Sequence, residues 1–443
     1  MKNINRRQFL KGSGLITLAG LGGVQVGFGS GLFKGVGSGN SKDLLIYIFL
    51  NGGMDGLNLM PPRSGSNYTE YSNTLRPSLH IPNTLSLPLN GQNEFGFHPS
   101  AEGMQELFNS NKMAIIHATG LLEANRSHFV STALMELGVQ SPSSNLGTGW
   151  LTRFSNSSLS SPDDALIPSI VPSYNNTDAV LGDPTALVMG SPNEFRLNQG
   201  HWAWESAMQN TITEIYNSPT TLEESVAHQT LRASQVVQGI NWLDYIPENN
   251  AEYPIGYFGD QLKTIAQMYK EDVDLEVAYI PTGGWDTHIG QGTGTTGEFA
   301  NLVQELSDGL KALYQDLSAS NGGKFTIIVQ SEFGRRAYEN LSNGTDHGYG
   351  NPMFVIGDNV NPGFYGQFPG LSANDLYEDE DLNVTVDYRD VVSEVLLKRM
   401  QNRFLGYIFP GYTDYTELGF INGTNQNPIY DFDFDPIFAS GFD

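Results

Sequence analysis

The chain has 443 residues, no cysteine and a formal net charge of −25 at pH 7. The absence of thiols excludes disulfides, thiolate metal sites and cysteine nucleophiles. The acidity argues against nucleic acid and anionic membranes as main partners, because phosphate binding needs clustered lysine and arginine. The length allows a large buried core, and the composition is that of a globular protein.

The first residues carry the pattern of an export signal. Arg6 and Arg7 are followed by Gln-Phe-Leu-Lys and then by a glycine-rich, mildly apolar run. This pattern is typical of a twin-arginine signal, and the alternative is a basic N-terminus before a buried helix. We expect residues 1–30 to be the signal peptide and residues 31–42 a flexible linker. The twin-arginine machinery would then export the chain to the periplasm or cell surface, with no transmembrane domain in the mature chain.

Apolar runs that are typical of buried strands alternate with helical patterns through most of the chain. The predicted strands are 43–50, 113–117, 274–280, 325–329 and 353–356, and the predicted helices are 101–108, 127–137, 201–242, 253–269, 299–317 and 384–397. This alternation predicts one α/β domain over residues 43–443, with a mostly parallel sheet between helices. Residues 138–200 are rich in Ser, Asn, Pro and Gly, which predicts a polar insertion within that domain.

Polar side chains follow the predicted strands or open the next helix, which is where open α/β sheets place their chemistry. The candidates are Asp55, Ser127, Asp286, His288, Glu332 and His347. Acids and histidines gathered at one sheet edge could hold one or two divalent cations, which clamp a phosphoryl or sulfuryl group. Mixed carboxylate and imidazole ligands suit zinc, manganese or iron better than calcium or magnesium.

Each candidate also has a structural interpretation. Asp55 could be a helix N-cap, and Ser127 could be either a cap or a nucleophile whose developing charge a helix N-terminus favours. Asp286 and His288 are two residues apart, so they could form a ligand pair or a polar turn. Arg335 and Arg336 could bind a substrate oxyanion as a fork or pair with the acidic surface. His201 and His228 fit surface or packing positions in helices.

The motifs together resemble a known family. The sequences RRQFLK, FLNGGMDGLN, NRSHF, GGWDTH, SEFGRR, GTDHG, NPMFVIG and TVDYRDVVSEVL resemble exported proteins of domain-of-unknown-function family 1501. That family resembles a branch of the alkaline phosphatase and sulfatase superfamily. The resemblance implies a three-layer α/β/α sandwich with metal ligands at strand ends.

The resemblance also implies roles for residues. Asp55, Asp286, His288, Glu332 and His347 match metal-ligand positions, although Glu332 stands where superfamily enzymes carry adjacent Asp and His. Ser127 matches the nucleophile, and Arg335 could steady the substrate anion.

Two functions are therefore open. The first is an exported hydrolase of phosphate or sulfate esters that uses a divalent metal, with Zn or Mn expected, on a small anionic ester or glycan. The second is a non-catalytic periplasmic or surface binding protein on the same fold.

Overall fold

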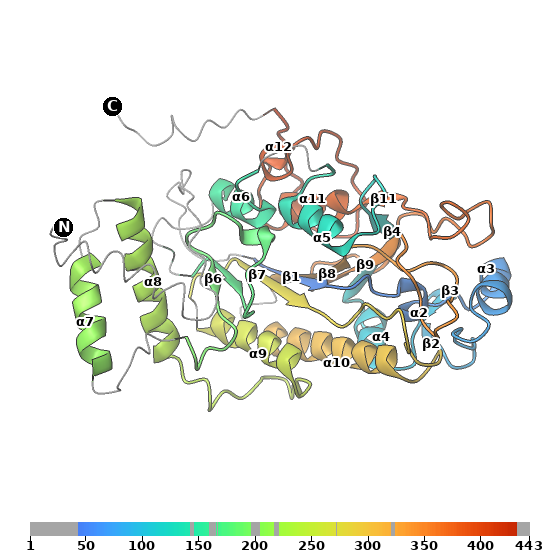
Figure 1. Ribbon diagram of the computed structural model, residues 1–443, viewed down its shortest axis with the longest axis horizontal. Coiled ribbons are helices and arrows are strands. Elements are labelled where there is room, and N and C mark those ends of the chain that lie inside the picture. The colour runs from blue at the N-terminus through green and yellow to red at the C-terminus, as the bar shows by residue number, and fades with distance from the viewer. Residues whose placement is uncertain are drawn as a thin grey trace, which may run out of the picture.

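A nine-stranded sheet lies between two layers of helices (Figure 1). The computed structural model describes residues 43–141, 146–158, 165, 167–195, 204–216, 221–271, 273–319 and 324–431. The expected signal peptide and linker, and His201, lie outside these residues. Within them, no helix is both long enough and apolar enough to cross a membrane.

The sheet is parallel except at one strand. Its order is β10 (Gly363–Tyr365), β4 (Met113–Gly120), β9 (Asn351–Ile356), β8 (Phe325–Ser331), β1 (Leu44–Leu50), β7 (Val277–Thr282), β5 (Ser169–Val171) and β6 (Leu187–Val188), with β11 (Val386–Asp387) beside β4. Strand β9 is antiparallel to both of its neighbours, β8 and β4. All other pairs in this sheet are parallel.

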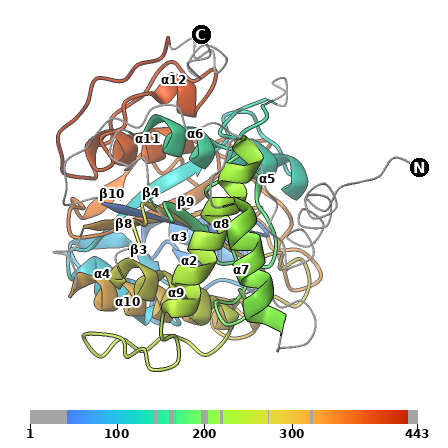
Figure 2. The same ribbon diagram turned by 90° about the vertical axis from the view of Figure 1, so that its left-hand side faces the viewer.

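Helices cover both faces of the sheet (Figures 1 and 2). One layer holds α4 (Glu102–Asn109), α9 (Tyr257–Lys270) and α10 (Glu298–Ser318), and the other holds α5 (His128–Leu137), α6 (Trp150–Ser157), α11 (Tyr388–Lys398) and α12 (Leu405–Ile408). Helices α7 (Glu205–Tyr216) and α8 (Leu222–Gly239) lie beyond the β6 edge. This arrangement confirms the predicted three-layer α/β/α fold with a mostly parallel sheet.

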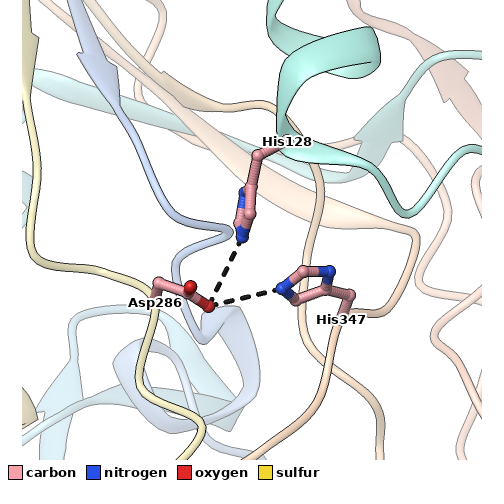
Figure 3. Close-up of side chains that lie close together, drawn as sticks. All are labelled: His128, Asp286 and His347. Atoms are coloured by element: carbon pink, nitrogen blue, oxygen red, sulfur yellow. Dashed lines mark hydrogen bonds and ion pairs between the residues drawn. The ribbon is translucent and has the colours of Figure 1, made fainter.

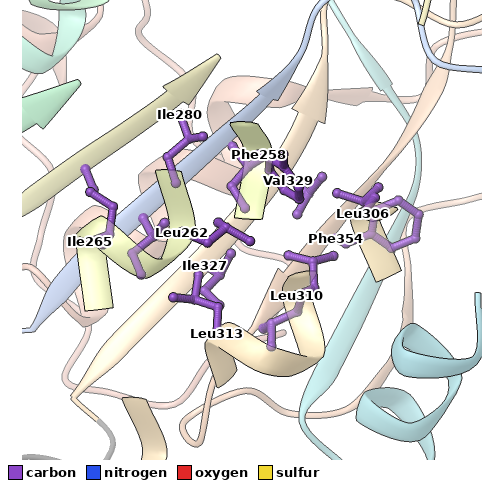
Figure 4. Packing of buried hydrophobic residues seen from close by; sticks show 14 of the residues in the cluster. Phe258, Leu262, Ile265, Ile280, Leu306, Leu310, Leu313, Ile327, Val329 and Phe354 are labelled. Carbon is purple, nitrogen blue, oxygen red and sulfur yellow. The ribbon is translucent and has the colours of Figure 1, made fainter. Parts of the chain in front are cut away.

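The alternation of side chains along β1 explains the two cores. All seven residues of β1 are buried; Leu44, Ile46 and Ile48 belong to one apolar cluster, whereas Tyr47 and Phe49 belong to the cluster on the opposite face. The first cluster continues into α9 and α10 (Figure 4). Each such side chain contributes roughly 1.5–3 kcal/mol when it leaves water, so the centre of the sheet is a rigid support for the loops at its edge.

The predicted polar insertion contains parts of this framework. Residues 138–200 supply α6, the 3-10 turn Asp178–Val180 and strands β5 and β6, which extend the central sheet. These strands have only three and two residues, too few to produce a periodic signal in the sequence. The remaining elements are α2 (Gly56–Leu59), α3 (Gly65–Glu70), the π-helical turn Tyr71–Leu75 and the hairpin of β2 (Leu87–Leu89) and β3 (Gln92–Phe97).

Candidate metal centre

The topology gathers five loops at one edge of the sheet. Strands β1, β7 and β8 are parallel and in register at their ends, where Leu50 lies opposite both Thr282 and Ser331. Strand β4 points the same way, because it and β8 are both antiparallel to β9. For the same reason β9 begins at this edge. The loops after β1, β4, β7 and β8 and the loop before β9 therefore converge there.

Four side chains from three of these loops meet at one carboxylate oxygen. Asp286 Oδ1 lies 3.1 Å from His288 Nε2, 3.3 Å from His347 Nε2 and 3.4 Å from His128 Nε2. Figure 3 shows His128 and His347 pointing toward Asp286 from the start of α5 and from the loop before β9. Ligand atoms of these three residues all lie within 4.8 Å of one another. His288 Nε2 joins the group at 2.8 Å from His347 Nε2.

The other ring nitrogen of each histidine is held by an oxygen. His128 Nδ1 lies 2.7 Å from Glu332 Oε1, and His288 Nδ1 lies 2.8 Å from Asp346 Oδ1. His347 Nδ1 lies 2.7 Å from the carbonyl oxygen of Arg126. A carbonyl or an ionised carboxylate only accepts hydrogen bonds, so Nδ1 carries the proton in all three rings. In the neutral rings, each Nε2 then presents a lone pair toward Asp286.

This arrangement of lone pairs offers a position for a cation. Two Nε2 lone pairs that face each other at 2.8 Å, beside an anionic oxygen, repel one another unless a positive charge lies among them. His128 Nε2 is moreover buried and has no hydrogen-bond partner among the described residues. Three imidazoles and one carboxylate form a donor set that zinc and similar divalent ions accept. Histidine ligands with Nδ1 fixed by a carboxylate or carbonyl are the usual support of such ions. The residues therefore fit a divalent metal.

The pKa shifts of Asp286 and His347 favour an anionic carboxylate beside a neutral ring, whereas that of His128 favours the protonated ring in the absence of a metal. The hydrogen bond to Glu332 raises the pKa of His128 above its usual value, against the effect of partial burial. Partial burial lowers the pKa of His347, which favours the neutral ring. Partial burial alone would raise the pKa of Asp286, but the hydrogen bond and charge of Arg335 lower it to about 2. Asp286 is therefore ionised at neutral pH.

Arg335 fixes the loop that carries Asp286. Its buried guanidinium donates to the carbonyls of Gly52, Gly53, Thr345 and Trp285, and its Nη2 donates to Asp286 Oδ1 at 2.6 Å. All three of its nitrogens are thus engaged by the protein. The contacts describe an anchor for Asp286 rather than a fork that is open to a substrate.

Asp55 lies outside the cluster. Its fully buried carboxylate accepts hydrogen bonds from Arg76 Nη1 at 2.7 and 2.6 Å and from Gln291 Nε2 at 2.6 Å. It also caps α2 through the backbone N–H of Asn58. Asp55 thus acts as a helix N-cap, which is the structural interpretation given above, and also as the partner of a buried arginine. Gln291 ties this ion pair to Thr287, next to Asp286, through a hydrogen bond of 3.0 Å.

Glu332 is present at the site, but it lies behind His128 instead of facing the cluster. Its Oε1 also accepts the backbone N–H of Gly52, and its Oε2 accepts the Ser331 hydroxyl. Ser127 is the N-cap residue of α5 and precedes His128 directly, and its side chain makes no capping hydrogen bond.

Two residues of the site were not predicted from the sequence. His128 was not a candidate ligand, and Asp346, which holds His288 as Glu332 holds His128, was not a candidate support. Asp346 immediately precedes His347 in the Asp-His-Gly motif, a signal that was available. His128 had only its position at a helix start, next to Ser127.

Residues 42–402 match the model of a protein family that is described as "Protein of unknown function (DUF1501)". The chain belongs to this family. The match spans Asp286, the three histidines of the candidate metal centre and the residues that hold them. No curated protein matches the chain by sequence.

Three solved structures illustrate more distant likeness. Ps i-CgsB, in complex with k-i-k-neocarrahexaose, gives a TM-score of 0.36 at 8% identity, over 85% of this chain and 75% of that chain. The PsFucS1 sulfatase from Pseudoalteromonas sp. gives 0.33 at 11% identity, over 87% and 74%. The periplasmic domain of EcEptC from Escherichia coli, a complex with Zn, gives 0.30 at 8% identity, over 72% and 74%. At such scores, the functional argument for this member of the DUF1501 family rests on its own residues.

Proposed function

We propose that this chain is an exported, metal-dependent hydrolase of phosphate or sulfate esters, with Zn or Mn as the ion. One observation carries the proposal: three imidazole Nε2 atoms converge on Asp286 Oδ1 while each Nδ1 is fixed by an oxygen. His128, His288, His347 and Asp286 would hold the metal.

A bound divalent cation supplies a Lewis acid that polarises an oxygen of the phosphoryl or sulfuryl group. The chain contributes orientation. Glu332, Asp346 and the Arg126 carbonyl keep the three rings in one tautomer, and Arg335 keeps Asp286 ionised and in place. Ligands fixed in this way need little rearrangement when a substrate binds, which favours catalysis.

Ser127 is the proposed nucleophile. It directly precedes the ligand His128, at the N-terminus of α5, and the partial positive charge of a helix N-terminus stabilises an alkoxide. The serine oxygen would bond to phosphorus or sulfur while the ester oxygen leaves as the alcohol, which takes up the serine proton. Water would then cleave the serine ester, release phosphate or sulfate and restore the hydroxyl.

Export remains part of the proposal. Arg6-Arg7 followed by Phe9-Leu10-Lys11 supports a twin-arginine signal in residues 1–30. Replacing both arginines by lysine should leave the chain inside the cell, as fractionation of expressing cells would show. Unchanged export would contradict this part of the proposal without touching the metal site.

The experiment combines metal analysis with turnover. Protein purified without chelator is analysed for bound metal and is then assayed on aryl phosphate and aryl sulfate esters. We expect His347→Ala to lose the metal and the activity, Ser127→Ala to keep the metal and lose activity, and His228→Ala, a control on α8, to change neither. Metal bound equally by wild type and His347→Ala would contradict the site. Activity retained in Ser127→Ala would contradict the nucleophile.

A further inference from the structure

We infer that the site selects esters that carry one negative charge and an apolar organic group, such as sulfate monoesters and phosphodiesters, over doubly charged phosphate monoesters. This inference rests on the proposed function and narrows its substrate class. Two independent features carry it: the charge of the groups around the proposed metal position, and the exposed apolar side chains on the segments that supply its ligands.

The first feature is the formal charge of the site. A divalent cation and Arg335 contribute three positive charges, and Asp286, Glu332 and Asp346 contribute three negative charges. The three imidazoles are neutral when they ligate a metal. The loaded site is therefore formally neutral, with its positive charge concentrated at the cation. A singly charged ester then leaves the complex with one net negative charge, whereas a dianion leaves it with two beside three carboxylates, which is less favourable where no further cationic side chain compensates.

The neighbouring arginines do not change this balance. Arg126 directly precedes Ser127, but its guanidinium donates to Asp381 at 2.7 Å and to Glu378 at 2.8 Å. Arg336 lies beside Arg335, and its guanidinium is paired with Glu380 at 2.8 and 3.0 Å. Phosphate monoesters are typically bound by arginines that are free to form a bidentate contact. Both of these arginines are already neutralised by carboxylates.

The second feature is a set of apolar side chains next to the ligands. Phe129 follows His128 and is 90% exposed, and Ile289 follows His288 and is 75% exposed. Leu341 is also exposed. Its loop is tied to that of Ile289, because Asn340 Nδ2 donates to the His288 carbonyl and Gly290 N donates to the Ser342 carbonyl.

Exposed apolar side chains that gather beside a site can cover the apolar part of a ligand and leave water with it. Phe129 follows a ligand on α5, Ile289 follows a ligand after β7, and Leu341 lies on the connection that leads to His347. These positions would let the three side chains receive the organic group of an ester held at the metal. We call Phe129, Ile289 and Leu341 the apolar rim. A ring or alkyl group on the substrate would cover the rim while its anionic end faces the cation.

Phosphonates that the protein cannot hydrolyse allow the effects of ligand charge and of apolar contact on binding affinity to be measured separately. Phenylphosphonate is a dianion above pH 8, its monomethyl ester is a monoanion with the same ring, and methyl methylphosphonate is a monoanion without a ring. Calorimetric titration of metal-loaded wild type should show the phenyl monoester binding about tenfold or more tightly than either of the others. Phe129→Ser should reduce the affinity difference between the monoanions with and without the ring. Leu243→Ser, at a similarly exposed position, should leave that difference unchanged.

Several outcomes decide the inference. Tighter binding of the dianion, or equal binding of the two monoanions, would overturn it. If the loaded protein hydrolyses aryl phosphate faster than aryl sulfate and the bis-aryl phosphodiester, the proposed function stands and this inference fails. If the protein holds no metal and binds no phosphonate, both fail. Phe129 is exposed, so its replacement tests substrate contact without disturbing the core.

Discussion

His128 Nδ1 and Glu332 Oε1 lie 2.7 Å apart, although 204 residues separate them in the chain. The contact joins the start of α5 to the end of β8 and directs His128 Nε2 toward Asp286. It makes Glu332 a positioning residue for a ligand. A carboxylate that accepts the second ring N–H of a metal-bound histidine fixes the tautomer and raises the basicity of the ligand.

Glu332→Gln should weaken metal binding while the fold is retained. The amide keeps the shape of the side chain but loses the charge that favours the Nδ1–H tautomer, so we expect affinity to fall roughly 10- to 100-fold. Competition with a chromophoric chelator measures this change. Glu214→Gln, an exposed carboxylate on α7, is the matched control. Equal affinities of the Glu332 and Glu214 variants would contradict the positioning role.

Arg335→Lys should destabilise the protein much more than Arg336→Lys. Arg335 is buried and donates to four carbonyls and to Asp286, and an ammonium cannot reach all of these acceptors. We expect the free energy of unfolding of the metal-free chain to fall by ~3 kcal/mol or more. For Arg336, which is partly exposed on Glu380, the loss should stay below ~1 kcal/mol. Urea denaturation compares the two, and similar losses would refute the assignment.

Gly52→Ala should disturb the metal site through the backbone. Gly52 has φ +123°, and an added Cβ would lie 2.4 Å from the backbone nitrogen of Asp286. The loop of Asp286 must move to make room, so we expect a loss of roughly 1–3 kcal/mol in stability and weaker metal binding. Gly283→Ala is the control, because a Cβ there meets no atom within 4 Å. Wild-type metal affinity in the Gly52 variant would count against this contact.

The free energy of unfolding should fall as the pH rises, because of Asp390 on α11. Burial raises the pKa of Asp390 from 3.8 to about 6, although Thr416 N and the Tyr412 hydroxyl donate to it. Between these values the folded state holds a proton that the unfolded state has released. The contribution of Asp390 is therefore complete below pH 3.8 and is lost as the pH rises through about 6, by up to ~3 kcal/mol.

Asp390→Asn removes this dependence because the amide stays neutral. Denaturation of the metal-free chain at a series of pH values should show wild type losing more stability than the variant between pH 4 and 7. Parallel curves would show that Asp390 has an ordinary pKa in the folded state.

The fold could be predicted because its signals are local. β1 and β8 are continuous apolar runs buried on both faces, and α10 repeats its apolar residues at helical spacing. Short elements such as β5 and β6 could not be predicted, because their residues join the sheet only through neighbours distant in sequence.

The candidate site was only partly predictable for the same reason. Asp286, His288 and His347 meet as strand-end residues should. His347 precedes its strand, and it reaches the common edge because β9 alone runs antiparallel. Asp55 and Glu332 also lie at strand ends. Tertiary packing brings Arg76 to Asp55 and His128 to Glu332, so both carboxylates bind these side chains. A polar residue at a strand end is predicted to lie near the site. Whether its side chain faces the proposed metal position or another residue depends on tertiary contacts.

The most direct test of the account is the metal content and X-ray absorption spectrum of the purified chain. We predict one divalent ion per chain, with a first shell of nitrogen and oxygen and the scattering of several imidazoles. His128→Ala, His288→Ala and His347→Ala should each lower the imidazole contribution or abolish binding, whereas Asp55→Asn should leave the spectrum unchanged. A chain that holds no metal after incubation with Zn or Mn, or a spectrum altered by Asp55→Asn but not by His128→Ala, would contradict the proposed centre.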